Sequence, residues 1–180
     1  METGDVVREA FGRIRQLVDR SVAGLDADAL AFRPDADANS IGWLVWHLTR
    51  TQDDHVAEIA GLDQTWITDG WAERFGMPAD PHDTGYGHTS EQVAAVRPLG
   101  PDLLTDYHAA VSDRTLEYLV VVDATELDRI IDRSYDPPVS VGVRLVSVIS
   151  DNLQHAGQAM YVRGILERTP ERRAGGSGTG

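Results

Sequence analysis

The sequence has 180 residues, of which 42% are hydrophobic and 25% charged, and it carries a formal net charge of −13. This composition is ordinary for one folded domain, and the excess of acidic residues disfavours nucleic-acid and anionic-membrane partners, because such a surface repels phosphate groups. The absence of cysteine excludes disulfides and protein thiolate ligands. With no secretory signal and no apolar run of about 18 residues, the sequence predicts a cytoplasmic location.

Four long segments have the spacing of amphipathic helices, with apolar residues three and four positions apart. The first covers residues 4–23, and the second covers residues 41–60 between Ser40, a favoured N-cap, and Gly61. The third, residues 101–122, starts at a first-turn proline, and the fourth covers residues 141–168. We therefore expect an all-α four-helix bundle, a single domain over residues 1–168, and a flexible C-terminal tail at residues 169–180.

The connection between the second and third helices, residues 61–100, is far longer than the others and is rich in glycine and proline. It also contains aromatic residues, and a long aromatic connection usually packs over the fold. One short helix is expected within residues 90–97, and a helical turn within residues 125–130. Because of this long connection, the pattern does not fix a simple up-down-up-down topology.

The fourth predicted helix places polar side chains among its apolar ones. Asp151, His155 and Gln158 follow one another at spacings of four and three, so they share one side of the helix. A buried carboxylate is costly unless it is paired or binds a metal, and a metal would satisfy both the acid and the histidine. A plain Asp–His hydrogen bond or a solvated face would explain the same spacing. The apolar residues expected to be buried beside them are Val148, Ile149, Leu153, Met160, Val162, Ile165 and Leu166.

The second predicted helix offers two histidines as a third ligand. His55 falls nearly on the apolar stripe of this helix, whereas His47 lies at the margin of the stripe, beside Trp43. Periodicity therefore favours His55 as the inward histidine, but it does not decide which of the two meets Asp151 and His155.

The segments NSIGWLVWHLTRTQDDHVAEIAG and DNLQHAGQAMYVRGIL resemble the DinB-like family, and GYGHTSEQVAAV is similar to an actinobacterial branch of that family. The resemblance implies a four-helix bundle with one metal ion, usually zinc or nickel. At the matching positions the implied ligands are His47, Asp151 and His155, so the resemblance favours His47 over His55. The family more often has His or Glu where this chain has Asp151, whose shorter side chain is a departure from the pattern.

Two histidines and one carboxylate leave coordination positions open, as catalytic zinc sites do, and the set also suits iron(II). A dication stabilises a thiolate over a thiol. The resembled family includes S-transferases that use mycothiol or bacillithiol, and a mycothiol-dependent maleylpyruvate isomerase with an additional C-terminal domain. The resemblance thus implies a metal-dependent S-transferase that joins a low-molecular-weight thiol, mycothiol in the first place, to a small electrophile. A non-catalytic metal-binding bundle (a sensor or an assembly module) and a metal-free scaffold are the alternatives.

Supporting roles follow from position alone. Asp54 lies two turns after His47 and could orient a ligand or act as a base, Gln158 could support a ligand, and Arg163 could meet a substrate carboxylate. Each of these has a plainer reading as a solvated or surface-paired side chain. A homodimer through a helix face is compatible with the pattern. Five aromatic residues could line an electrophile pocket or simply form part of the core: Trp43, Trp46, Trp66, Trp71 and Tyr86. His82 and His88, in the long connection, could cover the site. His108 is assigned no role in the chemistry.

Overall fold

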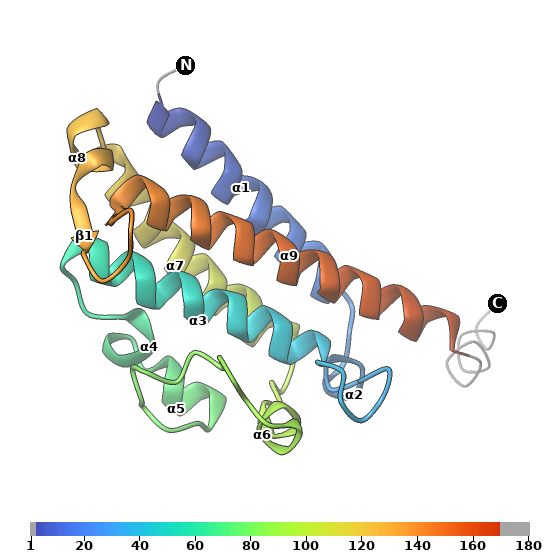
Figure 1. Cartoon of the computed structure of the whole chain (residues 1–180). Coiled ribbons are helices and arrows are strands. Elements are labelled where there is room, and N and C mark those ends of the chain that lie inside the picture. The colour runs from blue at the N-terminus through green and yellow to red at the C-terminus, as the bar shows by residue number, and fades with distance from the viewer. Residues whose placement is uncertain (1–2, 170–180) are drawn as a thin grey trace.

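A computed structural model describes residues 3–169 of the chain. Its four long helices are α1 (Thr3–Val22), α3 (Ile41–Ala60), α7 (Pro101–Val120) and α9 (Val141–Arg168) (Figure 1). Helix α3 packs against α7 and α9, and α1 packs against the same two helices, so the four form a bundle around one core. The predicted all-α bundle is confirmed, with helix ends within two residues of the expected ones. The predicted tail lies outside the described residues, except for Thr169.

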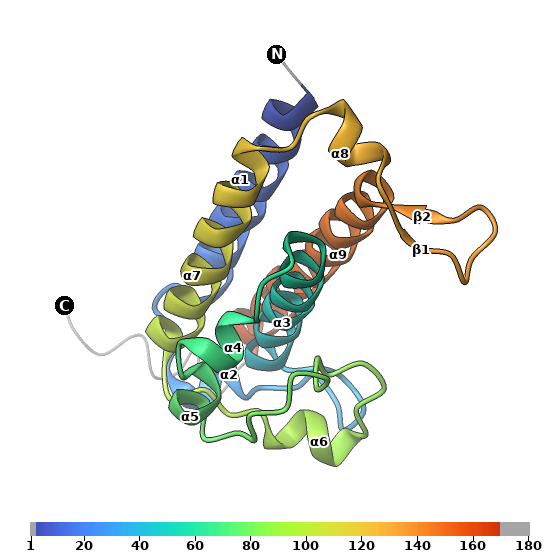
Figure 2. The same ribbon diagram turned by 90° about the vertical axis from the view of Figure 1, so that its left-hand side faces the viewer.

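The bundle is not a simple up-and-down arrangement. Helices α3 and α7 run in one direction, while α1 and α9 run in the other (Figure 2). The connection between α3 and α7 must therefore travel back along the bundle before α7 can begin. This geometry explains why residues 61–100 form a connection much longer than the others.

The long connection packs over the bundle, as its aromatic content predicts. It contains three short helices, α4 (Thr65–Thr68), α5 (Trp71–Phe75) and α6 (Ser90–Ala95). The rings of Trp66 and Trp71 are buried, with centroids 5.5 and 5.2 Å from that of Tyr107 on α7. These contacts cover one side of α3 and α7, so most of α3 is buried.

The other connections hold short elements. Helix α2 (Ala27–Leu30) follows α1, and α8 (Ala124–Asp128) precedes an antiparallel pair formed by β1 (Ile130–Asp132) and β2 (Val139–Ser140). The helical turn expected within residues 125–130 corresponds to α8. The two strands were not predicted, because strands of three and two residues are too short to show an alternating pattern.

The helix ends follow the expected caps. The Ser40 hydroxyl accepts a hydrogen bond from the Trp43 backbone N–H at 3.1 Å, and Gly61 ends α3 with a left-handed φ of 67°. None of the described helices combines the length and the apolar character that crossing a membrane requires. The centre of the core is formed by Phe11, Ile14, Val18, Leu44, Val45, Leu48, Leu104, Tyr107, Val111, Leu145 and Val148.

A buried series of side-chain hydrogen bonds joins three of the long helices, α3, α7 and α9, inside this core. The Gln52 side chain donates a hydrogen bond to Thr115 Oγ1 at 2.8 Å, and Asn152 donates one to Gln52 Oε1 at 2.7 Å. These bonds fix α9 against α3 at the residue next to Asp151. Two apolar residues of α9 predicted to be buried are instead exposed. Leu153 and Met160 point outward, because α9 is covered only on the sides that contact α1, α3 and, near its start, α8 and β2.

Candidate metal centre

Three side chains that could hold a metal ion converge between α3 and α9. One donor atom from each of His47, Asp151 and His155 lies within 4.8 Å of the others. His155 Nε2 is 3.4 Å from Asp151 Oδ1, and the two imidazole rings meet edge to face with centroids 4.6 Å apart. His47 is buried and the other two are half-buried. The structure thus brings together the three residues that the DinB-like resemblance selected.

His47 is oriented by its neighbours on α3 and on the long connection. Its Nδ1 lies 2.5 Å from the backbone carbonyl oxygen of Thr84, and a carbonyl can only accept, so Nδ1 carries the proton. The lone pair is therefore on Nε2. The Trp43 ring stacks on the imidazole at a centroid distance of 4.6 Å. Burial lowers the pKa of His47 by more than the Thr84 hydrogen bond raises it, which favours the neutral ring that a metal requires.

His155 also has its Nδ1 hydrogen-bonded to a neighbouring oxygen and its Nε2 turned toward the cluster. Its Nδ1 donates to Gln158 Oε1 at 2.9 Å, which leaves Nε2 on the side of Asp151. Burial opposes protonation, but the hydrogen bonds with Asp151 and Gln158 raise the pKa of His155 overall. Burial also raises the pKa of Asp151, yet the hydrogen bond and the charge of His155 outweigh it and lower that pKa. Both shifts favour an ionised Asp151 carboxylate beside His155.

The donors fit a divalent cation. Asp151 Oδ2 is buried and has no hydrogen-bond partner among the described residues. Such an atom is costly in a folded protein, and a cation would satisfy it together with His47 Nε2 and, in place of the proton that His155 shares with Asp151, with His155 Nε2. An Asp151–His155 hydrogen bond alone, the plainer reading of the sequence, leaves this oxygen unmatched. Two imidazoles and one carboxylate suit zinc, and also nickel or iron(II).

A hollow of about 280 Å³ opens beside the cluster. Its wall includes Asp54, whose Oδ1 accepts a hydrogen bond from Gln64 at 2.7 Å, and Tyr86, whose side chain is 94% exposed. The wall presents both polar and apolar atoms, and it reaches two of the three candidate ligands. The residues around the hollow are His47, Thr51, Asp54, His55, Thr84, Tyr86 and Asp151.

His55, the histidine that periodicity favoured, is not part of the cluster. It lines the hollow, with Nδ1 3.2 Å from Arg144 Nη1, and burial and this guanidinium lower its pKa. Periodicity misled here because the long connection covers α3, so a residue at the margin of the apolar stripe, such as His47, is buried as well.

Arg163 does not reach the candidate site. Its Nη1 donates to the carbonyl oxygens of Arg20 and Ala23 at 2.8 and 2.9 Å, and its Nε pairs with Glu167 at 2.7 Å. The predicted contact with a substrate carboxylate is therefore replaced by a structural one, because α9 passes the end of α1 at this residue. Arg163 fastens these two helices together.

The structure places some of the aromatic residues and histidines expected near the site in the core, and others at the hollow or on the long connection. Trp46, Trp66 and Trp71 are buried in the core, and of the five aromatics only Tyr86 lines the hollow. His88 lies on the inner side of the long connection, where it accepts from Trp43 Nε1 at 3.1 Å and lies 2.8 Å from Asp83 Oδ1. His82 is exposed, and His108 is buried beside Thr49.

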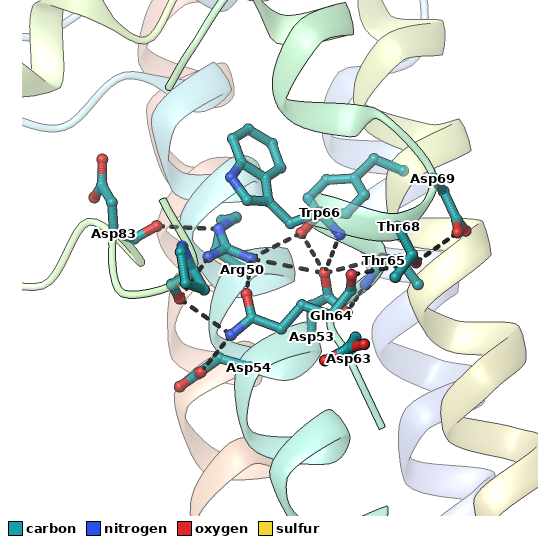
Figure 3. Close-up of polar contacts among 12 residues, drawn as sticks. Arg50, Asp53, Asp54, Asp63, Gln64, Thr65, Trp66, Thr68, Asp69 and Asp83 are labelled. Atoms are coloured by element: carbon teal, nitrogen blue, oxygen red, sulfur yellow. Dashed lines mark hydrogen bonds and ion pairs between the residues drawn. The ribbon is translucent and has the colours of Figure 1, made fainter. Parts of the chain in front are cut away.

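The side chain that holds the segment around Thr84 was not predicted from the sequence. Arg50 is fully buried on α3 and donates to the backbone carbonyls of Pro81 and Asp83 at 3.1 and 3.0 Å (Figure 3). Its ion pair with Asp53, at 3.6 Å, is completed by backbone N–H groups of α4 that donate to Asp53. The two charges thus hold both halves of the long connection on α3. The available signal was an Arg and an Asp three residues apart within a largely apolar helix.

Comparisons with known proteins agree with this geometry. The family described as mycothiol-S-transferase matches residues 6–168. A crystal structure described as the conserved protein of a locus from Enterococcus faecalis is 30% identical, with a TM-score of 0.87 over 94% of this chain and 99% of that one. A search of curated proteins gave no match. The chain therefore belongs to the mycothiol-S-transferase family, a family of DinB-like helical bundles.

Proposed function

We propose that this protein is a metal-dependent thiol S-transferase that joins a low-molecular-weight thiol, mycothiol in the first place, to a small electrophile. The observation that carries the proposal is the meeting of three oriented donor atoms at the edge of a hollow. The description of the matching family supports the type of reaction. The resulting reaction forms a bond between sulfur and the electrophilic carbon, while the thiol proton and any leaving group depart.

His47, Asp151 and His155 would hold the cation, with zinc the first candidate. A bound dication would favour the thiolate, which is the nucleophilic form of a thiol. Thr84 and Gln158 orient the imidazoles, because each accepts a hydrogen bond from an Nδ1–H group and so keeps Nε2 turned toward the cluster. This orientation exists in the protein before any ligand binds, which reduces the ordering cost of binding.

The hollow would bind the thiol. Asp54 lies in its wall and is placed to accept the thiol proton, and Thr51 and Tyr86 offer hydroxyl groups. The carboxylates of Asp54 and Asp151 disfavour a further negative charge in the same space. We therefore expect an uncharged, hydroxyl-bearing thiol to be used in preference to a thiol with carboxylates, such as glutathione.

The experiment is a conjugation assay with mycothiol and a fluorogenic electrophile, using metal-free protein before and after addition of zinc. We expect a zinc-dependent rate above that of the protein-free control, lost in His155→Ala and retained in His82→Ala, which removes an exposed histidine from the loop. Zinc binding without a rate above the control, for mycothiol and for related thiols, would refute the transferase and leave a metal-binding bundle. Equal, near-zero metal content in the unaltered protein and in His155→Ala would refute the metal centre.

A further inference from the structure

A second hollow lies between α9 and the loop that joins α2 to α3 (Figure 1). Its volume is about 510 Å³, compared with about 280 Å³ for the first hollow, the one beside Asp151. Its wall is formed by the loop from Pro34 to Asn39, by Leu44 of α3 and by the part of α9 from Gln158 to Ile165. This volume is sufficient for a small molecule, because small-molecule sites span about 300–1,000 Å³.

The two hollows lie on opposite sides of the candidate metal centre. On α9, Asp151 lines the first hollow and Gln158 lines the second, one turn before and one turn after His155. On α3, which runs in the opposite direction, Leu44 lines the second hollow and Thr51 lines the first. Ligands in the two hollows would therefore meet at the metal centre.

The surface of the second hollow is mostly apolar. Leu44 and Val162 are buried and form its base, and Ile165 is half-buried. Tyr161 lies in its wall and is 69% exposed. A tyrosine ring beside an apolar base offers a contact surface for the flat, apolar body of a ligand.

Gln158 connects the second hollow to the candidate metal ligands. Its Oε1 accepts the hydrogen bond from His155 Nδ1 at 2.9 Å, which fixes the side chain and leaves Nε2 as a donor. Within residues 3–169, no acceptor for Nε2 is found. Because Gln158 also lines the second hollow, Nε2 can donate to an oxygen of a ligand bound there. That hydrogen bond would hold one end of the ligand next to His155.

The charged side chains of the second hollow are acidic. Asp35 and Asp37 lie at its exposed rim, and neither forms an ion pair with a described residue. Arg33 does not line the hollow, because its guanidinium donates to the carbonyl oxygens of Ala36 and Ala38. These bonds fix the loop, so the hollow is formed before a ligand binds. The two carboxylates disfavour a ligand that carries a carboxylate of its own.

We propose that the second hollow binds the electrophile of the transfer reaction, and that it selects uncharged electrophiles with an aromatic or other apolar body and an oxygen that accepts from Gln158. This inference rests on the proposed transferase function. The first hollow is too small for two substrates, and its hydroxyl groups on Thr51 and Tyr86 suit the thiol. The sulfur and the electrophilic carbon are then supplied from opposite sides of the metal centre. The sulfur–carbon bond forms as the leaving group departs with its bonding electrons, and the thiol proton is accepted in the first hollow.

The first test measures binding of an electrophile to the metal-free full chain without any thiol, so it requires no reaction. The probe is the chlorodinitrobenzene with a nitro group on each side of the chlorine, and its comparison carries an added carboxylate opposite the chlorine. Because the sequence has neither cysteine nor lysine, the probes meet no side-chain thiol or amine. In amide NMR spectra we expect shifts at residues 34–39 and 158–165 and none at residues 84–86. The carboxylated probe should bind at least about fivefold more weakly.

Matched variants assign the binding to the second hollow. Tyr161→Ala should weaken binding of the uncharged probe about 2–10-fold, the equivalent of one lost aromatic contact, whereas Tyr135→Ala, at a similarly exposed tyrosine of the hairpin loop, should not change it. Asp37→Asn should reduce the preference for the uncharged probe at least about twofold, whereas Asp28→Asn, which removes an exposed charge from α2, should not. Thermal melts confirm that each variant is folded.

The second test uses the zinc-loaded protein with mycothiol and the uncharged probe. Tyr161→Ala should raise the KM for the electrophile about 2–10-fold and leave the KM for the thiol unchanged. Absence of binding, shifts confined to the first hollow, equal binding of both probes, or an unchanged electrophile KM in Tyr161→Ala would overturn the second hollow as the electrophile site, even in an active transferase. Binding at residues 34–39 and 158–165 without any transfer would support the second hollow and refute the transferase instead.

Discussion

Replacement of Gly85 by alanine tests how the long connection holds the candidate metal centre. Gly85 follows Thr84, has a φ of 89°, and packs on α3 so closely that an added Cβ would lie 2.8 Å from the Trp46 ring and 3.1 Å from His47 Nδ1. A left-handed φ alone costs a residue with a Cβ roughly 1–2 kcal/mol. Insertion of a methyl group against a buried indole adds about 1–3 kcal/mol. The new atom also displaces Thr84 from His47.

Gly87 provides the matched control. It has a φ of 75°, but an added Cβ there meets no atom within 4 Å, so Gly87→Ala introduces the backbone strain without the overlap. We expect Gly87→Ala to lose about 1–2 kcal/mol of unfolding free energy. Gly85→Ala should lose about 2–5 kcal/mol, and its zinc affinity should fall about 10–100-fold, the range measured when the partner of a ligand histidine is removed.

Urea denaturation of the metal-free variants gives the first quantity, and competition with a chelator gives the second. Both are measured on the same preparations, so folding and binding can be compared directly. Equal stability and equal zinc affinity in Gly85→Ala and Gly87→Ala would refute the reasoning, because the two variants differ only in what surrounds the new methyl group.

Three further predictions concern buried charge, pH and the hollow. Asp53→Asn should lower the unfolding free energy by about 3–5 kcal/mol, because it leaves a buried guanidinium without its counter-charge; urea denaturation measures this, and a loss below about 1 kcal/mol, or one no larger than that of the exposed Asp69→Asn, would contradict it. Burial lowers the pKa of His108 to about 3 from an ordinary value of 6.5, so between these values the unfolded chain binds a proton that the folded protein does not. The unfolding free energy should therefore fall as the pH drops below about 6.5, by up to roughly 2 kcal/mol by pH 5. In His108→Leu, urea denaturation at several pH values should show a smaller loss of unfolding free energy over this range than in the unaltered protein. An equal loss in both would exclude this histidine as the cause. Tyr86→Ala should raise the KM for the thiol about 2–10-fold, the equivalent of one lost aromatic contact, with unchanged thermal stability, whereas Tyr135→Ala on the hairpin loop should change neither; an unchanged KM would remove Tyr86 from the binding surface.

The bundle could be predicted closely because local interactions decide it. The helix ends can be recognised from Ser40 as an N-cap, Gly61 as a C-cap and Pro101 as a first-turn proline, and the apolar spacing indicates helices instead of strands. The same local logic failed for β1 and β2, which are too short to carry a pattern. It also placed Leu153 and Met160 inside the core, because spacing shows that a helix has an apolar side but not how much of that side its neighbours cover.

The candidate site depended on contacts that spacing does not contain. The pair Asp151 and His155 is visible on one helix, and the DinB-like resemblance pointed to His47, yet periodicity alone favoured His55. What decides between the two histidines is the return of residues 61–100 along α3, which buries His47 and gives its Nδ1 the carbonyl of Thr84. Arg50 fastens that segment, and its partners lie about thirty residues away in the sequence.

The sequence by itself thus determined the four helices, the acidic and cysteine-free surface, and the two polar residues that stand one turn apart on the last helix. Only the tertiary structure decided which histidine joins them, which carbonyl and amide orient the rings, and which face of α9 stays uncovered. The physical reason is that caps and periodicity act over a few residues, whereas these features arise where the antiparallel helices α3 and α9 and the long connection are packed against each other.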